Sequence, residues 1–435
     1  MAIDEAIRLR SDATLERTDS VRILRAGFAR VSLGAPEPAG DAALDLLRNG
    51  GGSELDVVRA AVSVGGEQAV IPLQMLLHRL RSGGWLQRTL RIDGRPVATL
   101  RPLGHRAPTP SAPLDPDVPV RVSRFALMRS EGGETLLESP RVAAQVVVHD
   151  PAVAGIFASP SEAPDELLQL LSDAGILVQD DEPGVWSFHE LLFHARSRFG
   201  RHVGGFGGTY RFEGEVEPLP AVKPTVGPTI ALPVPKADPG LSLAEAMEER
   251  ESVRRHDDEH PIDVAQLGEL LYRCARVRRV FSDGKQELSN RPYPSGGSTY
   301  ELEIYPLVRL CAGVEPGFYR YDPAGHALEH VSEPSASTQS LLEFARITSV
   351  MDGPPQVALL VTSRFARVAW KYESIAYALT LKQVGALFQS LYLVSTALGL
   401  APCAQGGGDP DAFAAATGID YETESTVGEF VVGSA

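Results

Sequence analysis

Residues 290–308 read NRPYPSGGSTYELEIYPLV and set a tight loop directly before an apolar strand. Pro294, Ser295, Gly296 and Gly297 form this loop. Adjacent glycines let a backbone approach a flat ring closely, while amide N–H groups and hydroxyls can bond to the edge of the ring. The neighbouring Arg291 can balance negative charge on such a ring. A plain β-turn explains the loop equally well when it is considered alone.

Upstream, residues 248–257 read EERESVRRHD, where a helix gives way to an extended turn. Arg250, Ser252 and Arg254 place two guanidiniums and a hydroxyl within five residues. Such groups can hold a phosphate dianion by charge-assisted, bidentate hydrogen bonds. The alternative is a solvated basic turn whose charge is balanced by the surrounding glutamates and aspartates.

Downstream, residues 368–385 read VAWKYESIAYALTLKQVG and put Lys371 beside Tyr372 at the start of a long apolar stretch. Both side chains ordinarily keep their protons at neutral pH, so either acts as a base only where its surroundings lower its pKa. The alternative is a snorkelling lysine beside a half-buried tyrosine. Further on, Gly406 and Gly407 offer a second close backbone approach or simply a flexible loop.

These motifs lie in a region, residues 241–435, whose pattern alternates between helix and strand. Apolar periodicity predicts helices over 241–255, 263–277 and 374–400, and strands over 300–310 and 356–364. We expect an α/β domain with a mixed sheet flanked by helices. Residues 383–408, which include the end of the last of these helices, contain no charged residue. The stretch does contain glutamines, serines and a proline, which favour a helix buried in a core or a subunit interface over a membrane span.

The amino-terminal half contains two segments of similar order, residues 1–106 and 118–210. Each shows a strand pair, helices, and a helix that leads through a glycine into a strand, as in LLHRLRSGGWLQR (76–88) and LLQLLSDAGILVQD (167–180). This order of elements is typical of a winged-helix domain. In the second copy it predicts a short return strand near residues 184–189. The proline-rich segment 211–240 predicts an extended connector. The predicted fold class is therefore α+β, with two small winged-helix-like domains before the α/β domain.

Charge and cysteine content exclude several classes of function. The net charge of −15 argues against nucleic acid or an anionic membrane as the main partner. The three cysteines show neither zinc spacing nor a disulfide framework, so we predict no metal site. The first twenty residues lack the apolar core of a signal peptide, and we expect a cytoplasmic protein.

The order of the motifs over residues 241–435 resembles the nitroreductase-like FMN enzymes and, more narrowly, the SagB-type azoline dehydrogenases of ribosomal peptide natural-product pathways. The resemblance rests on the 250–254 turn, the loop at 294–297, GFYRYDPAGHALEHV (317–331), Lys371-Tyr372, QSLYLVSTALGL (389–400) and the glycine loop. It implies that FMN is the cofactor and that its phosphate binds to Arg250, Ser252 and Arg254. The isoalloxazine ring would contact Arg291, Pro294, Ser295, Gly296 and Gly297. Gly406 and Gly407 would complete the pocket. The resemblance also implies that Lys371 and Tyr372 remove a proton.

The resemblance further implies a homodimer that oxidises thiazoline or oxazoline rings in a precursor peptide. It also implies a complex with a cyclodehydratase, and amino-terminal domains that act as peptide clamps for the leader. Three alternatives stay open: an NAD(P)H-dependent nitro- or quinone reductase, a flavin-free peptide-recruiting scaffold, and a DNA-binding winged helix. The last is disfavoured because the predicted recognition helices carry few cations. One departure from the family is that no Lys, Arg or His follows Lys382. Either the 250–255 cluster holds the phosphate, or the flavin is held more weakly than the family suggests.

Overall fold

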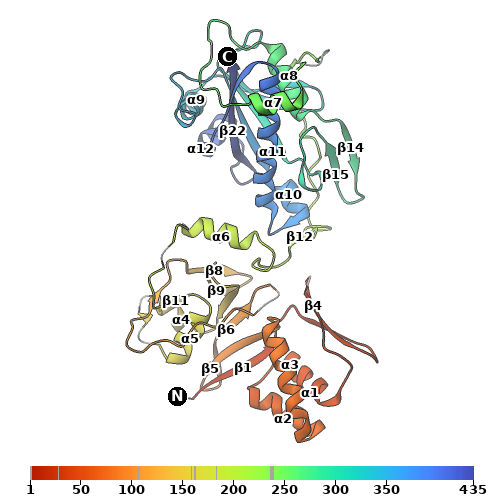
Figure 1. The fold of residues 1–435 in the computed structure, drawn as a ribbon, viewed down its shortest axis with the longest axis vertical. Helices are drawn as coiled ribbons and strands as arrows, with labels where there is room; N and C mark the ends of the chain where they lie inside the picture. Colours follow the sequence, from red (N-terminus) through yellow and green to blue (C-terminus); the bar gives the residue numbers. More distant parts are fainter. Residues whose placement is uncertain are drawn as a thin grey trace. The chain divides into compact units, whose positions relative to one another are not determined.

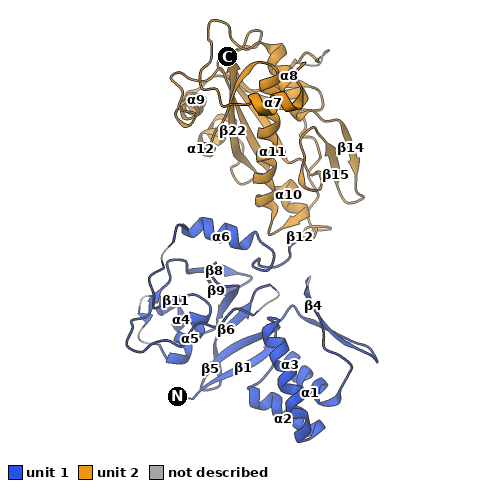
Figure 2. Ribbon diagram, viewed as in Figure 1, with its two compact units in different colours: residues 1–206 blue, residues 207–435 orange. Residues whose placement is uncertain are grey.

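The computed structural model describes residues 2–27, 29–104, 107–157, 159–160, 163–182, 184–235 and 240–435. The chain divides into two compact units, residues 1–206 and residues 207–435 (Figure 2). Each unit is described by itself.

The second unit is built on a seven-stranded sheet in the order β13-β18-β17-β16-β19-β22-β21 (Figure 1). Its strands are β13 (Thr229–Ala231), β16 (Leu302–Val308), β17 (Gly317–Asp322), β18 (Ala327–Ser332), β19 (Val357–Arg364), β21 (Leu400–Ala404) and β22 (Glu424–Ser434). Every neighbouring pair is antiparallel in the described residues, so the predicted mixed sheet is wrong. Short turns join β16, β17 and β18, and a chain that reverses through a short turn must pair antiparallel.

Helices and small ribbons surround this sheet. They are β12 (Gly207–Gly208), α7 (Leu243–Glu249), α8 (Val264–Ala275), β14 (Arg279–Ser282), β15 (Glu287–Asn290), α9 (Ala336–Thr348), α10 (Phe365–Lys371), β20 (Tyr372–Glu373), α11 (Ala376–Ala397) and α12 (Pro410–Thr417). β14 and β15 form a hairpin, and β12 pairs with β20. The expected long helix over 374–400 is present as α11, two to three residues shorter at each end.

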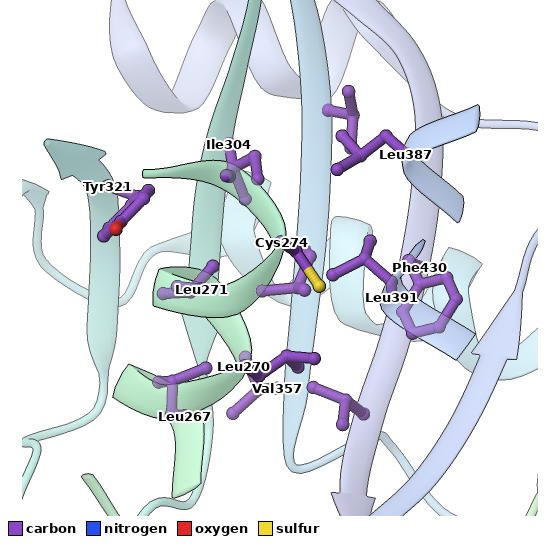
Figure 3. Close-up of a cluster of buried hydrophobic side chains, with 14 of the residues drawn as sticks. Leu267, Leu270, Leu271, Cys274, Ile304, Tyr321, Val357, Leu387, Leu391 and Phe430 are labelled. Atoms are coloured by element: carbon purple, nitrogen blue, oxygen red, sulfur yellow. The ribbon is translucent and has the colours of Figure 1, made fainter. Parts of the chain in front are cut away.

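The main core of the second unit lies between the sheet and the helices α8 and α11 (Figure 3). α8 begins at Asp263, whose side chain caps the helix, and buries Leu267, Leu270, Leu271 and Cys274 on one face. From α11, Leu387 and Leu391 enter the same cluster, and α9 and α12 cover a second cluster that includes Tyr305, Phe413 and Val431. We expected α11 to be buried on all sides, in a core or a subunit interface. In the single chain, its outer face is exposed at Leu381, Gly385 and Gln389.

Residues 217–235 of the proline-rich segment are extended, as their composition predicts, whereas residues 211–216 form turns. Buried arginines of the second unit hold the extended part in place. The Arg367 guanidinium donates to Leu219 O (2.6 Å), Arg364 to Pro220 O (3.0 Å) and Arg320 to Pro224 O (3.2 Å). An extended proline-rich chain forms no internal hydrogen bonds to its carbonyl groups, so these arginines supply the donors that the carbonyl groups need. Part of the expected connector, from residue 236 to 239, lies outside the described residues.

The first unit contains one six-stranded sheet in the order β1-β5-β6-β10-β9-β8, a three-stranded sheet β2-β3-β4 and the short ribbon β7-β11. Its strands are β1 (Ile3–Leu9), β2 (Thr14–Arg17), β3 (Arg22–Ala26), β4 (Ala29–Ser32), β5 (Leu86–Ile92), β6 (Arg95–Pro102), β7 (Arg121–Val122), β8 (Leu127–Glu131), β9 (Glu134–Glu138), β10 (Ala144–Val148) and β11 (Leu177–Val178). Its helices are α1 (Pro38–Arg48), α2 (Glu54–Gly65), α3 (Val70–Ser82), α4 (Ala152–Gly155), α5 (Asp165–Asp173) and α6 (Phe188–Arg196).

The predicted order of elements is present in the first segment, where three helices are followed by the β5–β6 hairpin turning at Asp93 and Gly94. The structure does not separate the segments 1–106 and 118–210, because β6 of the first pairs with β10 of the second. The return strand expected near 184–189 is not found among the described residues there, which lead into α6.

Candidate active site

The loop predicted to face a ring lies directly against the predicted base pair. Gly297 has φ +59°, in the left-handed region, and its carbonyl accepts a hydrogen bond from Lys371 Nζ (3.2 Å). A Cβ at this position would overlap the Tyr372 hydroxyl and would lie 2.9 Å from Lys371 Nζ. The two polar side chains therefore border the space that only a glycine leaves open, which joins two motifs about 75 residues apart in sequence.

Ser295 connects the same loop to α11. Its hydroxyl donates to Gln383 Oε1 and accepts from the backbone N–H of Tyr300 (3.0 Å). Gln383 is 4% exposed, and its Nε2 has no partner among the described residues. A buried amide donor without a partner is costly. The Gln383 Nε2 atom is also 3.7 Å from where a Cβ of Gly296 would stand, so this unused donor is at the loop.

The electrostatic surroundings of Tyr372 act in opposite directions. Burial raises the pKa of Tyr372, while the Lys371 ammonium lowers it, and the net pKa remains above the ordinary value. Lys371 Nζ is 3.6 Å from the Asp283 carboxylate, in the turn between β14 and β15. Without a bound ligand, therefore, Tyr372 carries its proton at neutral pH.

The predicted phosphate-binding turn lies at the other end of α11. The hydroxyls of Ser252 and Tyr392 share a hydrogen bond of 2.8 Å, and Tyr392 Oη accepts from the backbone N–H of Ala404 (2.8 Å). Arg250 lies over the Tyr392 ring at 5.3 Å, and Arg254 is exposed.

The acidic residues near this turn do not neutralise it. Asp258 pairs with Arg309 at 2.7 Å, and Asp257 pairs with His260 at 2.8 Å. Within the described part of the chain, no carboxylate forms an ion pair with Arg250 or Arg254. Two guanidiniums are thus available to an external anion beside a fixed hydroxyl.

Both groups of residues contact the same helix. Gln383 meets the loop and Tyr392 meets the turn, nine residues further along α11, which corresponds to about 14 Å of helix. Because nine residues also rotate a helix by about half a turn, Gln383 and Tyr392 project from opposite sides of α11, and the loop and the turn contact the helix from different sides.

Arg291 and the glycines at 406 and 407, which were also predicted to contact the cofactor, do not lie as expected. Arg291 is buried and donates to Leu302 O (3.2 Å) and Ala221 O (3.4 Å), so its guanidinium is committed to the backbone. Gly406 and Gly407 have open space where a Cβ would stand. The close approach occurs instead at Gly408, against the Glu429 carboxyl, whose pKa is raised to about 7 by burial.

Sequence reasoning missed Gln383, Tyr392, Asp283 and Tyr210, of which the last two surround Lys371. Tyr392 stood within a quoted motif, and its periodicity on the helix was the available signal. Asp283 and Tyr210 carry no local signal, because they reach Lys371 from segments about 90 and 160 residues away in sequence.

Across the described parts of the chain, no group of His, Cys, Asp and Glu side chains is arranged to hold a metal ion. No helix within the same parts has the length and apolarity that crossing a membrane requires.

Comparison with known proteins finds two family matches. Residues 247–434 match the nitroreductase family, and residues 120–182 match the family described as cyanobactin oxidase ThcOx. These matches confirm the resemblance seen in the motifs of the second unit and extend it into the first.

Individual relatives match the carboxyl-terminal region at modest identity. A nitroreductase homologue from Methanocaldococcus jannaschii is 26% identical over 175 residues, covering 40% of this chain and 83% of the relative. The microcin B17-processing protein McbC of Escherichia coli is 30% identical over 149 residues, covering 33% of this chain and about half (52%) of the relative. Among solved structures, the E. coli microcin synthetase McbBCD complex with truncated pro-MccB17 bound aligns at 22% identity, over 56% of this chain and 90% of that one, with a TM-score of 0.36.

Proposed function

We propose, from the premise that residues 247–434 are a nitroreductase-family domain, that the protein is an FMN-dependent azoline dehydrogenase. It oxidises thiazoline or oxazoline rings in a ribosomally made peptide to thiazoles or oxazoles. The observation that carries the proposal is the contact of Lys371 and Tyr372 with the Gly297 loop, because it sets two proton-binding groups against the backbone that is expected to face a flat ring. The similarity to the microcin B17-processing protein McbC supports the choice of substrate.

FMN fits the residues present. The unused Nε2 donor of Gln383 and the Ser295 hydroxyl match the polar edge of a flavin ring, and Arg250, Ser252 and Arg254 match its phosphate. When bound, FMN supplies an acceptor for the hydride that leaves the azoline ring. Because Gly297 has no side chain, the Lys371–Tyr372 pair can lie directly against the backbone of the loop that is expected to contact the ring system.

The residues of this chain carry the proton half of the reaction. Aromatisation removes one proton and one hydride from neighbouring ring atoms, and the Lys371–Tyr372 pair takes the proton. Since Tyr372 is protonated in the resting structure, we expect kcat/KM to rise with pH above neutrality as more of the pair reaches its proton-accepting form.

The decisive experiment is a mass spectrum of an azoline-containing peptide after incubation with the FMN-loaded protein. We expect a loss of two hydrogens per ring, together with bleaching of the flavin under anaerobic conditions. Tyr372→Phe should retain yellow, stoichiometric FMN and should lose at least about 10²-fold in rate. Full azole formation by both Tyr372→Phe and Lys371→Ala would contradict the assignment.

A second candidate, an NAD(P)H-dependent nitro- or quinone reductase, is favoured by the match to the archaeal nitroreductase homologue. It predicts rapid anaerobic bleaching of the flavin by NADPH alone and no response to the azoline peptide. The dehydrogenase predicts the reverse.

The first unit is proposed to bind the leader part of the precursor peptide as an added strand at a sheet edge. Its match to the cyanobactin oxidase family over residues 120–182 supports this assignment. An excess of free leader peptide should then raise the KM of the full substrate without changing the turnover of a leaderless azoline. The cyclodehydratase complex stays a further proposal, to be tested by co-purification.

A homodimer is proposed through the outer face of α11. Leu381 and Tyr377 are 39% and 47% exposed there, and Gly385 provides a small residue for close helix approach. Gly385→Glu should convert a dimer to a monomer in sedimentation and should weaken FMN binding.

A further inference from the structure

The segment that enters the second unit, residues 207–221 and here called the strap, runs directly over the Lys371–Tyr372 pair. β12 of the strap pairs antiparallel with β20, so that Gly208 is opposite Tyr372, and Tyr210 N donates to Lys371 O (3.2 Å). Further along, the Trp370 indole donates to Val216 O (2.7 Å) and Arg367 donates to Leu219 O. Figure 1 shows β12 next to α10, which ends at Lys371. The strap therefore fixes the backbone of both candidate catalytic residues.

The strap also brings an aromatic side chain to Lys371. The Tyr210 ring meets the Trp370 ring edge to face with centroids 5.8 Å apart, and Lys371 Nζ is 5.6 Å from the Tyr210 centroid. The Tyr210 hydroxyl donates to Asp283 Oδ2 (3.3 Å). Tyr210 is held at φ +54°, a conformation uncommon for a residue with a bulky side chain, which the surrounding contacts must stabilise.

The Asp283 carboxylate is oriented by its own hairpin turn. Its Oδ1 accepts from the backbone N–H groups of Lys285 and Gln286, both at 3.0 Å, which leaves Oδ2 to face Lys371 Nζ at 3.6 Å and the Tyr210 hydroxyl. Burial alone would raise the pKa of Asp283, but these N–H groups and the Lys371 charge hold it below the ordinary value. The carboxylate is thus ionised throughout the neutral range.

Lys371 Nζ consequently stands among three groups from three separate segments: the Gly297 carbonyl, the Asp283 carboxylate and the Tyr210 ring. All three are partners of an ammonium cation: a carbonyl that accepts its hydrogen bond, a carboxylate of opposite charge and an aromatic ring. The surroundings therefore suit a fixed cation better than a base.

We infer that Asp283 and Tyr210 are positioning residues that hold the Lys371 ammonium charged against the Gly297 carbonyl, so that the proton from the substrate ring goes to the Tyr372 oxygen. This inference rests on the proposed function. Tyr372 takes the proton as tyrosinate and becomes the phenol, and the electron pair of the broken C–H bond stays in the ring as the new double bond. A bound FMN would accept the hydride from the neighbouring ring atom. The Lys371 cation stabilises the tyrosinate that the step requires.

Other charged groups around Lys371 come from every element packed against it. They are Lys285 in the hairpin, Glu213 in the strap, Glu373 in β20 and the buried Glu301 that precedes β16. Lys285 and Glu213 neutralise each other at 2.5 Å, and Glu373 accepts from the Thr209 hydroxyl (2.9 Å). Among the described residues, the carboxylate that forms an ion pair with Lys371 is that of Asp283.

The first test measures the charge state of Lys371 without any turnover. The chain has only five lysines, at 223, 236, 285, 371 and 382, so competitive labelling with acetic anhydride over a range of pH reports each one by mass spectrometry. In Asp283→Asn, we expect Lys371 to react roughly threefold to tenfold faster at pH 8 than in the wild type, because its counter-charge is gone. Lys382 should be unchanged.

The matched control is Glu213→Gln, which is also an acid-to-amide change and breaks the neighbouring Lys285 ion pair. It should accelerate labelling of Lys285 and leave Lys371 as in the wild type. Asp283→Asn keeps an Oδ1 acceptor for the turn, so its thermal midpoint should move by less than about 3 °C. Tyr210→Phe keeps the ring over Trp370 and should raise Lys371 labelling by only about twofold. Unchanged Lys371 labelling in Asp283→Asn would overturn the inference.

The second test uses the sign of the change in oxidation rate. With Lys371 as the fixed cation, Asp283→Asn should lower kcat at alkaline pH, where more of Lys371 loses its proton, with KM unchanged. With Lys371 as the proton acceptor, the same variant would instead raise the rate at neutral pH, and that result would reject the assignment of Tyr372. If the wild type oxidises no azoline, the proposed function fails, while the labelling result still decides the role of Asp283.

Discussion

The two ends of α11 present candidate ligand contacts that are built in different ways. At the Gln383 end, the loop at 294–297, Ser295 and Lys371 are joined by hydrogen bonds, and several of the atoms are buried. At the Tyr392 end, one hydroxyl pair is fixed while the guanidiniums of Arg250 and Arg254 are half-buried and exposed.

The difference corresponds to two kinds of physical task. Positions where bonds break need groups held within a fraction of an ångström, because small displacements are costly in rate. A phosphate is held mainly by charge, which acts over longer distances and tolerates side-chain motion. Variants at the Gln383 end should therefore change turnover, and variants at the Tyr392 end should change cofactor affinity.

The largest effect is expected from Gly297→Ala. The new methyl group would overlap the Tyr372 hydroxyl and force a residue with a side chain into the left-handed region. We expect kcat to fall by about 10²-fold while FMN remains bound. Gly296→Ala is the matched control, since its nearest neighbour is Leu379 at 3.4 Å, and it should keep more than about half of the activity. Equal losses in both variants would break the proposed contrast.

The next effect is expected from Arg250→Ala combined with Arg254→Ala. Loss of two charge-assisted donors should weaken FMN binding by about tenfold to a hundredfold, measured by fluorescence titration of the apoprotein. The loss should shrink at high salt, because the guanidiniums are not deeply buried. At saturating FMN, kcat should remain within about twofold of the wild type. A large fall in kcat at saturation would show that this end also controls the chemistry.

The smallest effect is expected from Gln383→Leu, a change of similar volume. The Nε2 donor has no partner in the described chain, so its removal should leave the thermal midpoint of the apoprotein within about 3 °C. FMN affinity should fall by about fivefold to tenfold, equivalent to one hydrogen bond. Unchanged affinity would mean that the buried amide serves only Ser295.

Sequence reasoning located the motifs well where the signal was local. The extended turn after α7, the loop at 294–297 and the helix after Tyr372 all lie where composition and periodicity predicted them. The sheet was predicted less well, since strand direction depends on which strands become neighbours and not on any one strand. The separation of residues 1–106 from 118–210 was also not found, because β6 of the first segment pairs with β10 of the second.

Sequence by itself determined which residue types could do the chemistry: the proton-binding pair, the arginines and the glycine loop. Only the tertiary structure decided their partners. Asp283 and Tyr210 reach Lys371, and Gln383 reaches Ser295, across long separations in sequence. Hydrogen bonds and ion pairs depend on distances of a few ångströms, which chain folding sets and local residue pattern does not record.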